Sequence, residues 1–260
     1  MDQILKSVTT GIVALSIGFV LFSLLERMFS LTSAKKSWRA NLIDVRYAFL
    51  SMLYTPFIYL ILSAIFGLMA LKITFDSPQK GFLALQLLVF LFARDLVIYV
   101  RHWIFHSRRL WPFHSIHHSS EELNWLSAVR FHPAENLIEG TGEILCFLGF
   151  SIIGFDPKVL FVAGLVIGFY NFFIHSNLRW TLGPLRYVLV SPVLHRWHHS
   201  DRPEAADKNF AAMFSCIDLL FGTFYMPKDS CPTTTGLCGD ERNTHPTTFA
   251  GQLLYPFRKR

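Results

Sequence analysis

Histidine is the residue type whose spacing in this chain most clearly indicates chemistry. The chain has 11 histidines among 260 residues, and most of them fall into three short groups. These groups are His102 with His106, then His114 with His117 and His118, then His195 with His198 and His199. Residues at positions i, i+3 and i+4 of an α-helix share one face. Each group therefore presents its imidazoles in one direction, as a metal site requires.

The residues around the groups predict the helices that carry them. Pro112 and Pro192 lie shortly before the two triplets, and proline is favoured in the first turn of a helix. Ser191 can cap the second of these helices. His175 ends a long apolar run, with Asn171 one turn before it on the same face. We therefore expect two short helices with triplets, facing histidines at the ends of longer helices.

The number and type of these side chains predict two metal ions. Imidazole suits zinc, copper, iron and nickel, and nine histidines are too many ligands for one ion. Structural zinc sites usually include cysteine, and the absence of cysteine near the groups also argues against an iron–sulfur centre. Two adjacent iron ions with open positions could activate O2, whereas zinc could not do redox chemistry. The predicted ligands are His102, His106, His114, His117, His118, His175, His195, His198 and His199.

Three more side chains are candidate ligands or hydrogen-bond partners of ligands: Asn171, His132 and Asp95. Asp95 lies two helical turns before His102, so it could accept a hydrogen bond from a ligand imidazole, which would fix the tautomer. The alternative for Asp95 is an ion pair with a neighbouring arginine. For His132 we favour a role as a hydrogen-bond partner of a ligand. Asn171 could be a weak or water-mediated ligand, and the alternative is that its amide serves helix packing.

Two further sets of residues keep alternative roles. Glu135 and Glu139 lie one turn apart after His132, and they could orient ligand histidines or pair with Arg130. We expect no role at the site for His245, which lies in a Thr- and Pro-rich tail.

The composition predicts an integral membrane protein. Hydrophobic residues make up 52% of the chain and charged residues only 16%, and phenylalanine occurs 26 times. These values exclude a disordered chain, a coiled coil and a secreted disulfide scaffold. We attribute the formal net charge of +6 to cytosolic loops and anionic head groups, and we expect no nucleic-acid partner. The four cysteines lack paired spacing and are expected to be reduced thiols.

Five apolar stretches are candidates for membrane-embedded helices, since a bilayer core needs about 20 apolar residues in a helix. They cover residues 8–29, 47–71, 81–101, 145–155 and 159–173. The first reads as an anchor, and the last two are short enough to form a hairpin that dips into the bilayer. Gly164 and Gly168 form a small-x3-small pattern, which is more often typical of close helix packing than of a pocket.

Basic residues predict the orientation of these stretches. The segment between the first two stretches is richer in lysine and arginine than the segment between the second and third, so the first is expected in the cytosol. Every histidine group then lies on the cytosolic side. We predict an all-α, multi-pass integral membrane protein with about four to five membrane-embedded helices and a cytosolic helical cap that holds a di-metal site.

Three regions are expected along the chain. Residues 1–93 form N-terminal transmembrane helices, and residues 94–226 form a histidine-box catalytic domain with the membrane hairpin. Residues 227–260 form a C-terminal tail that loops over the surface.

The histidine groups resemble the histidine boxes of the membrane fatty acid hydroxylase/sterol desaturase superfamily. The surrounding residues are also similar: Asn-Trp at 124–125, Arg-Phe-His-Pro at 130–133, Phe-Ile-His-Ser-Asn at 173–177, Asn-Phe at 209–210 and Phe-Gly-Thr at 221–223. Where many members have a second histidine one turn before His175, this chain has Asn171. The resemblance covers residues 94–226.

The resemblance implies a non-haem di-iron oxygenase that hydroxylates an unactivated C–H bond of a lipid, such as a sterol, fatty acyl or ether lipid. It implies two iron ions as cofactors, which zinc can replace in purified protein. It also implies O2 as co-substrate and a separate electron donor, either a b-type cytochrome or a ferredoxin with its reductase. Desaturation at the same site is the alternative reaction. A histidine-rich metal transporter or sensor is the alternative from another class, but it needs a polar path across the bilayer, which the first two apolar stretches do not offer.

Overall fold

Helices form the whole architecture of the described chain. A computed structural model describes residues 2–32, 38–70, 82–228 and 230–258, and over these ranges it contains no β-strand beyond one isolated bridge. The predicted all-α class is therefore confirmed for the described residues. The long helices are α1 (Asp2–Phe29), α2 (Trp38–Ala70), α3 (Leu83–Phe105), α5 (Pro133–Ile152) and α6 (Pro157–His175). The short helices are α4 (Trp111–His118), α7 (Pro192–His198), α8 (Ser215–Phe221), α9 (Gly239–Thr244) and α10 (Phe249–Leu254).

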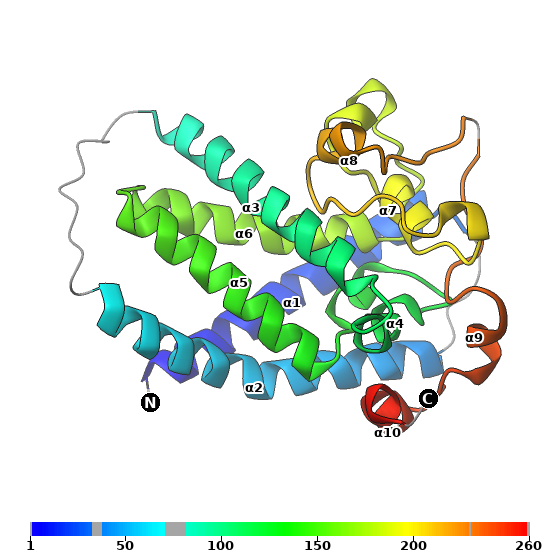
Figure 1. Ribbon diagram of the computed structural model, residues 1–260, viewed down its shortest axis with the longest axis horizontal. Coiled ribbons are helices and arrows are strands. Elements are labelled where there is room, and N and C mark those ends of the chain that lie inside the picture. Colours follow the sequence, from blue (N-terminus) through cyan, green and yellow to red (C-terminus); the bar gives the residue numbers. More distant parts are fainter. Residues whose placement is uncertain (1, 33–37, 71–81, 229, 259–260) are drawn as a thin grey trace.

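The long helices bring five of their ends to one side of the molecule. The C-terminal ends of α1, α3 and α6 and the N-terminal ends of α2 and α5 approach the short helices, which lie toward the right in Figure 1. In the packing of this bundle, α2 contacts α5, α3 contacts α6, and α6 contacts α7. Because the histidines lie at these ends and on the short helices, the bundle carries them to one place.

The helices that position the site begin with the signals seen in the sequence. Proline occupies the first turn of α4, α5, α6 and α7, where its missing N–H costs nothing. The side chain of Ser191 accepts a hydrogen bond from Leu194 N and caps α7, as expected. Asp156 caps α6 in the same way.

Helix α5 is longer than the apolar stretch that predicted it. It begins at Pro133 rather than near residue 145, because its first half carries glutamates whose partners lie inside the protein rather than in solvent. Its second half and α6 form a helical hairpin with a short connection around residue 154, and the expected insertion of this hairpin into the bilayer stays a prediction. Two described helices, α3 and α6, are long and apolar enough to cross a membrane. The expected four to five membrane-embedded helices and their orientation stay predictions.

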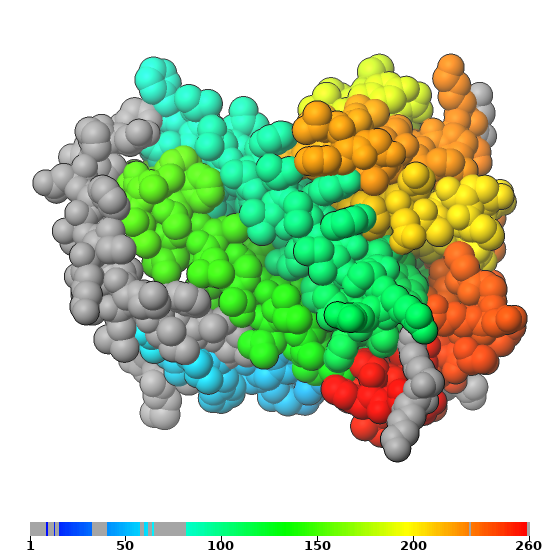
Figure 2. Space-filling view, in the orientation of Figure 1, coloured from blue at the N-terminus to red at the C-terminus, as the bar shows by residue number. Residues whose placement is uncertain are grey.

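The C-terminal residues are more structured than expected. They form α9 and α10, and the backbone N of Gly236 donates to the carbonyl of His199. His245 is buried, with its ring against Tyr255 and near Ser115 of α4. Figure 2 shows the orange and red C-terminal segments lying against the green surface of the α4 region. The tail thus encloses the end of the molecule that holds the histidines. All four cysteines are unpaired.

Candidate metal centre

All nine predicted ligands come together in two adjacent clusters. Within each cluster the nitrogen atoms that could bind a metal lie within 4.8 Å of one another. The five-histidine cluster consists of His102, His106, His114, His118 and His198. The four-histidine cluster consists of His117, His175, His195 and His199.

Helices α4 and α7 each supply histidines to both clusters. On α4, His114 and His118 face the five-histidine cluster while His117 faces the other. On α7 the division is reversed, because His195 and His199 join the four-histidine cluster and His198 joins the five-histidine one. Residues four apart lie closer to one helical face than residues three apart. The repeated triplet therefore lets one helical turn contribute imidazoles to two clusters that lie side by side.

Within the clusters, neighbouring imidazoles point their Nε2 atoms at each other. In the five-histidine cluster, His114 Nε2 lies 3.0 Å from His102 Nε2 and 3.1 Å from His118 Nε2. In the four-histidine cluster, His175 Nε2 lies 3.2 Å from His117 Nε2 and 3.0 Å from His195 Nε2. Because a zinc–imidazole bond is about 2.0–2.1 Å long, two ligands at right angles on one ion are about 3.0 Å apart. The spacing is that of nitrogens sharing an ion.

The hydrogen-bond partners of the Nδ1 atoms explain why the neighbouring Nε2 atoms need a cation. In six of the histidines, Nδ1 lies within hydrogen-bond distance of an oxygen acceptor. Four of these acceptors are backbone carbonyls: Phe210 O for His102, Arg130 O for His117, Asn171 O for His175 and Lys208 O for His198. The other two are the carboxylates of Asp207 for His106 and Glu135 for His114. A carbonyl only accepts hydrogen bonds, so Nδ1 carries the proton and Nε2 is left with a bare lone pair. Bare lone pairs 3 Å apart repel each other. A metal ion between them turns this repulsion into coordination, so the residues present fit metal ions.

Unpartnered buried atoms lead to the same conclusion. Among the described residues, Nε2 of His106 and Nε2 of His198 are buried and have no hydrogen-bond partner. Both atoms belong to the five-histidine cluster. A buried polar atom left without a partner costs free energy of about 1–3 kcal/mol. Coordination of an ion in this cluster would remove that cost.

Burial keeps the imidazoles neutral, as ligands must be. It lowers the pKa of six cluster histidines outside the long helices well below the ordinary value, and these are His114, His117, His118, His195, His198 and His199. The neighbouring imidazoles lower these pKa values further, because a second positive charge nearby is unfavourable. The clusters therefore present uncharged nitrogen donors near neutral pH.

Two carboxylates contact the Nδ1 atoms of cluster histidines. Glu135 is fully buried, and its Oε1 lies 2.5 Å from His114 Nδ1. Burial raises the pKa of this carboxyl well above the ordinary value, and the charge of an ion bound by His114 would offset that cost. Asp207 lies 3.0 Å from His106 Nδ1. A carboxylate on the second ring nitrogen fixes the tautomer and raises the basicity of the ligand.

These contacts settle alternatives left open by the sequence. Of the two glutamates considered for ligand orientation, only Glu135 contacts a cluster histidine in the described part of the chain. Glu139 instead pairs with Arg101, and Arg130 pairs with the fully buried Asp44 of α2. Asp207 was not foreseen, because it belongs to an irregular loop and its partner lies 101 residues earlier, so no helical spacing connects the two.

Asp95 has a different role from the one expected. Its carboxylate accepts hydrogen bonds from the backbone N–H groups of Ala212, Met213 and Phe214. It therefore contacts no imidazole, because this loop segment occupies the space in front of it. The same loop supplies the Phe210 carbonyl that accepts from His102. Asp95 thus supports His102 through the backbone of the loop.

Asp218 holds the other side of this loop. It accepts hydrogen bonds from the backbone N–H of Phe210 and Ala211 and from the hydroxyl of Thr223. Burial raises the pKa of Asp218 to about 6. Two buried carboxylates, one from α3 and one from α8, therefore fix the carbonyl that orients His102.

The remaining candidates lie outside the two clusters. His132 caps α5 by accepting from Ala134 N, and its other ring nitrogen donates to Leu253 O at 3.2 Å. Both of its nitrogens are thus engaged away from the metal centre, which argues against a role as ligand or partner. The side chain of Asn171 donates to Ala128 O, while its backbone carbonyl accepts from His175. A ligand role for the Asn171 side chain stays a prediction.

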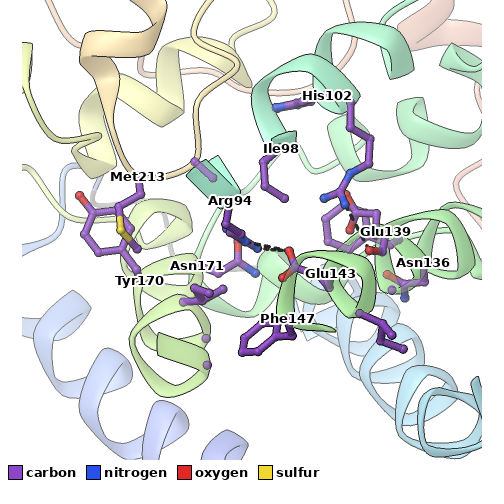
Figure 3. Close-up of a pocket in the computed structure, with 18 of the residues that line it drawn as sticks. Arg94, Ile98, His102, Asn136, Glu139, Glu143, Phe147, Tyr170, Asn171 and Met213 are labelled. Atoms are coloured by element: carbon purple, nitrogen blue, oxygen red, sulfur yellow. Dashed lines mark hydrogen bonds and ion pairs between the residues drawn. The ribbon is translucent and has the colours of Figure 1, made fainter. Parts of the chain in front are cut away.

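A cavity of about 790 Å³ leads from the clusters into the bundle between α3, α5 and α6. Near the metal centre it is lined by His102, His114, His117, His175 and His195. Its wall continues past polar side chains to apolar ones, including Phe147 and Leu160, and Figure 3 shows the polar part. Gly164 and Gly168 also line it.

The expectation that the two glycines serve close helix packing is wrong. A Cβ added at Gly168 would meet nothing within 4 Å, and one at Gly164 would only touch the ring of Phe147 at 3.9 Å. The small residues therefore widen the cavity on the α6 side.

Comparison with known proteins bears on this arrangement. The family model for fatty acid hydroxylase matches residues 87–223, which is more than half of the chain and includes all nine histidines. The chain belongs to the fatty acid hydroxylase family. No solved structure matches the chain.

Several curated proteins resemble this family member. It is 30% identical to the ornithine lipid hydroxylase OlsE of Rhizobium tropici over 185 residues, which are 70% of this chain and 54% of that protein. It is 30% identical to an alkylglycerol monooxygenase of Caenorhabditis elegans over 227 residues, 86% of this chain and 42% of that protein. It is 29% identical to methylsterol monooxygenase 1 of Rattus norvegicus over 129 residues, 48% of this chain and 41% of that protein. The chain spans about half the length of the curated relatives it matches.

Proposed function

We propose that this protein is a membrane-bound non-haem di-iron oxygenase that hydroxylates an unactivated C–H bond of a lipid. The observation that carries the proposal is that the two all-histidine clusters lie at one end of a cavity, and that the end of this cavity away from the clusters is apolar. A metal store or sensor needs ligands but no such cavity. The names of the relatives, which are hydroxylases and monooxygenases, favour hydroxylation over desaturation.

In this proposal the nine histidines hold two iron ions, which supply O2 binding and redox chemistry that protein side chains lack. Nitrogen donors alone also suit zinc, so zinc can replace iron in purified protein. The reaction places one oxygen atom of O2 in the C–H bond and reduces the other to water. It therefore consumes two electrons and two protons per turnover, and a separate reduced carrier protein delivers the electrons.

The side chains of the protein bind, orient and shield rather than react. Glu135 and Asp207 hold the proton of their histidines at Nδ1, so that Nε2 stays a donor to metal. The burial of the clusters and the apolar cavity wall exclude water from the reacting C–H bond, which prevents loss of the oxidant to side reactions.

The membrane provides both the substrate and the setting. Both helices that could cross a membrane expose large apolar side chains, among them Leu88, Phe92 and Val97 on α3 and Phe161 and Leu165 on α6. Such a surface is unfavourable in water and stable in lipid. With α3 and α6 embedded, the cavity between them extends into the bilayer, and we propose that the histidine end faces the cytosol.

Isotope labelling tests the proposal. Iron-loaded protein is incubated under labelled O2 with a reductant and a polar lipid extract, and the products are analysed by mass spectrometry. We expect a lipid heavier by one labelled oxygen atom. This product should be absent with His117→Ala and with His198→Ala, which remove one ligand from each cluster. A lipid that loses two hydrogens without gaining oxygen would indicate desaturation, and labelled product that persists in both variants would contradict the proposal.

A further inference from the structure

The middle of the cavity wall contains two ion pairs between α3 and α5. Arg94 donates from Nε to Glu143 Oε1 at 2.8 Å and also from Nη2 to the same oxygen. Arg101 donates from Nη2 to Glu139 Oε1 at 3.1 Å. All four side chains line the cavity, and Arg94 with Glu143 is only 11% and 16% exposed. Figure 3 shows the Arg94–Glu143 pair at the centre of the cavity.

Stability alone does not account for these pairs. Removing two charges from water costs about as much as their attraction returns, and apolar residues of similar size often replace a buried pair without loss. Ionisable residues at membrane depth are rare and usually mark a functional site. The pairs lie on the cavity surface rather than inside a packed helix interface, which places their charges where a ligand would meet them.

The pairs have unused hydrogen-bonding capacity. Because both bonds of Arg94 go to one oxygen of Glu143, the other carboxylate oxygen and the Nη1 group of Arg94 have no partner among the described residues. A ligand with both acceptors and donors would satisfy these groups.

The charges of the wall select the ligand. The charges of the two arginines and the two glutamates cancel. A headgroup with net negative charge would therefore be repelled by the glutamates, and a headgroup with net positive charge would be repelled by the arginines. A headgroup that carries both charges can place its anion on a guanidinium and its ammonium on a carboxylate. We propose that the Arg94–Glu143 and Arg101–Glu139 pairs form a binding site for the zwitterionic headgroup of a lipid.

The order of residues along the helices places this site next to the metal centre. On α5, Glu135 contacts the ligand His114, and Glu139 and Glu143 follow at successive turns. At 1.5 Å per residue these turns lie about 6 and 12 Å further along the helix axis. The apolar residues Phe147 and Leu160 line the cavity beyond the pairs. The lipid therefore lies with its headgroup toward the metal centre and its tail toward the apolar end, and the oxidised carbon is in or near the headgroup.

This inference rests on the proposed function only in taking the cavity as the substrate site, so binding is measured without turnover. The full chain in a non-ionic detergent is loaded with zinc, which supports no oxygenation. Its affinity is measured for three lipids with the same single acyl chain: a zwitterionic lysophosphatidylethanolamine, an anionic lysophosphatidylglycerol and a neutral monoacylglycerol. We expect the zwitterionic lipid to bind about tenfold more tightly than the other two, as the gain of a charge-assisted hydrogen bond predicts.

Two double variants locate the preference. Arg94→Gln with Glu143→Gln neutralises one of the two pairs and keeps two hydrogen-bonding side chains, and it should lose most of the preference for the zwitterionic lipid while retaining its metal. The control, Glu121→Gln with Arg242→Gln, neutralises an ion pair whose side chains are 60% and 42% exposed. It should keep the preference for the zwitterionic lipid. Each variant is accepted only when its thermal unfolding is cooperative.

Several results would overturn the inference. They are equal binding of the three lipids by the unmodified protein, a preference for the anionic or the neutral lipid, or an undiminished preference in the neutralised variant. The comparison on the unmodified protein needs no substitution, so it is decisive even if the variant does not fold. A zwitterion preference without any oxygenated product in the labelling experiment would leave this site standing and refute the oxygenase.

Discussion

Replacing Glu135 with glutamine changes one buried contact of the metal centre and little else. Glutamine has nearly the same size and keeps an oxygen that can accept from His114 Nδ1. The substitution removes the negative charge from a side chain that is fully buried and 2.5 Å from that nitrogen. Because the carboxylate touches one ligand of the five-histidine cluster and none of the four-histidine cluster, its loss should weaken the binding of one ion only.

The size of the effect follows from this geometry. Mutation of a hydrogen-bond partner of a ligand typically weakens metal affinity about 10- to 100-fold, which is about 1.4–2.8 kcal/mol. The burial of the contact removes screening by water, and a charge-assisted bond is about twice as strong as a neutral one. We therefore expect a loss toward the upper end, about 30- to 100-fold.

Metal competition measures this loss. Metal-free protein is titrated with Fe²⁺ under anaerobic conditions against a chelator of known affinity, and two binding steps are fitted. Glu135→Gln should weaken one step and leave the other unchanged. Glu139→Gln is the matched control, because it lies one turn further along α5 and pairs with Arg101 rather than with a histidine. It should leave both steps unchanged.

Two outcomes would refute the reasoning. If both steps of Glu135→Gln stay within twofold of the unmodified protein, the carboxylate does not tune the ion held by His114. If both steps weaken equally while Glu139→Gln is normal, the two clusters are not separate sites.

Three other substitutions test separate parts of the structure. His132→Ala should lower the free energy of unfolding by about 0.5–2 kcal/mol through loss of the α5 cap, and it should keep the full metal content. If elemental analysis shows that this variant has lost metal, His132 is a ligand after all. Asp95→Asn leaves one oxygen for three buried N–H groups, so chemical denaturation should show a loss of about 1–3 kcal/mol or more, and unchanged stability would contradict the role of Asp95 as support of the loop. Gly168→Leu projects a side chain into open cavity space and would displace a bound lipid from its reactive position, so it should lower lipid turnover at least about tenfold with normal metal content and melting temperature. Normal turnover would show that the lipid does not use this part of the cavity.

The histidine clusters could be predicted from sequence because their geometry is local. A triplet at i, i+3 and i+4 fixes the direction of its imidazoles whatever the rest of the chain does. The division of each triplet between two clusters could not be foreseen, because it depends on how α4 and α7 face each other. The residues that orient the ligands were also out of reach, since Asp207 and the Phe210 carbonyl reach α3 from a loop more than 100 residues away.

Hydropathy predicted a hairpin of two apolar helices, but it misjudged the polar residues that precede it. The polar first half of α5 was missed because its glutamates, which a hydropathy pattern assigns to solvent, pair with α3 inside the protein. Spacing correctly put Asp95 on the inner face of α3 but could not reveal the loop that covers it. The pattern of Gly164 and Gly168 has two physical uses, close packing and open space, and only the position of the neighbouring helices distinguishes them.

The iron content of the protein tests the central claim most directly. Protein purified anaerobically from iron-supplied cells is stripped, reloaded with Fe²⁺ and examined by elemental analysis and Mössbauer spectroscopy. The two clusters predict two irons per chain that are spin-coupled after oxidation, and His117→Ala should retain one. Iron binding that does not exceed that of the double variant His117→Ala with His198→Ala would contradict the account.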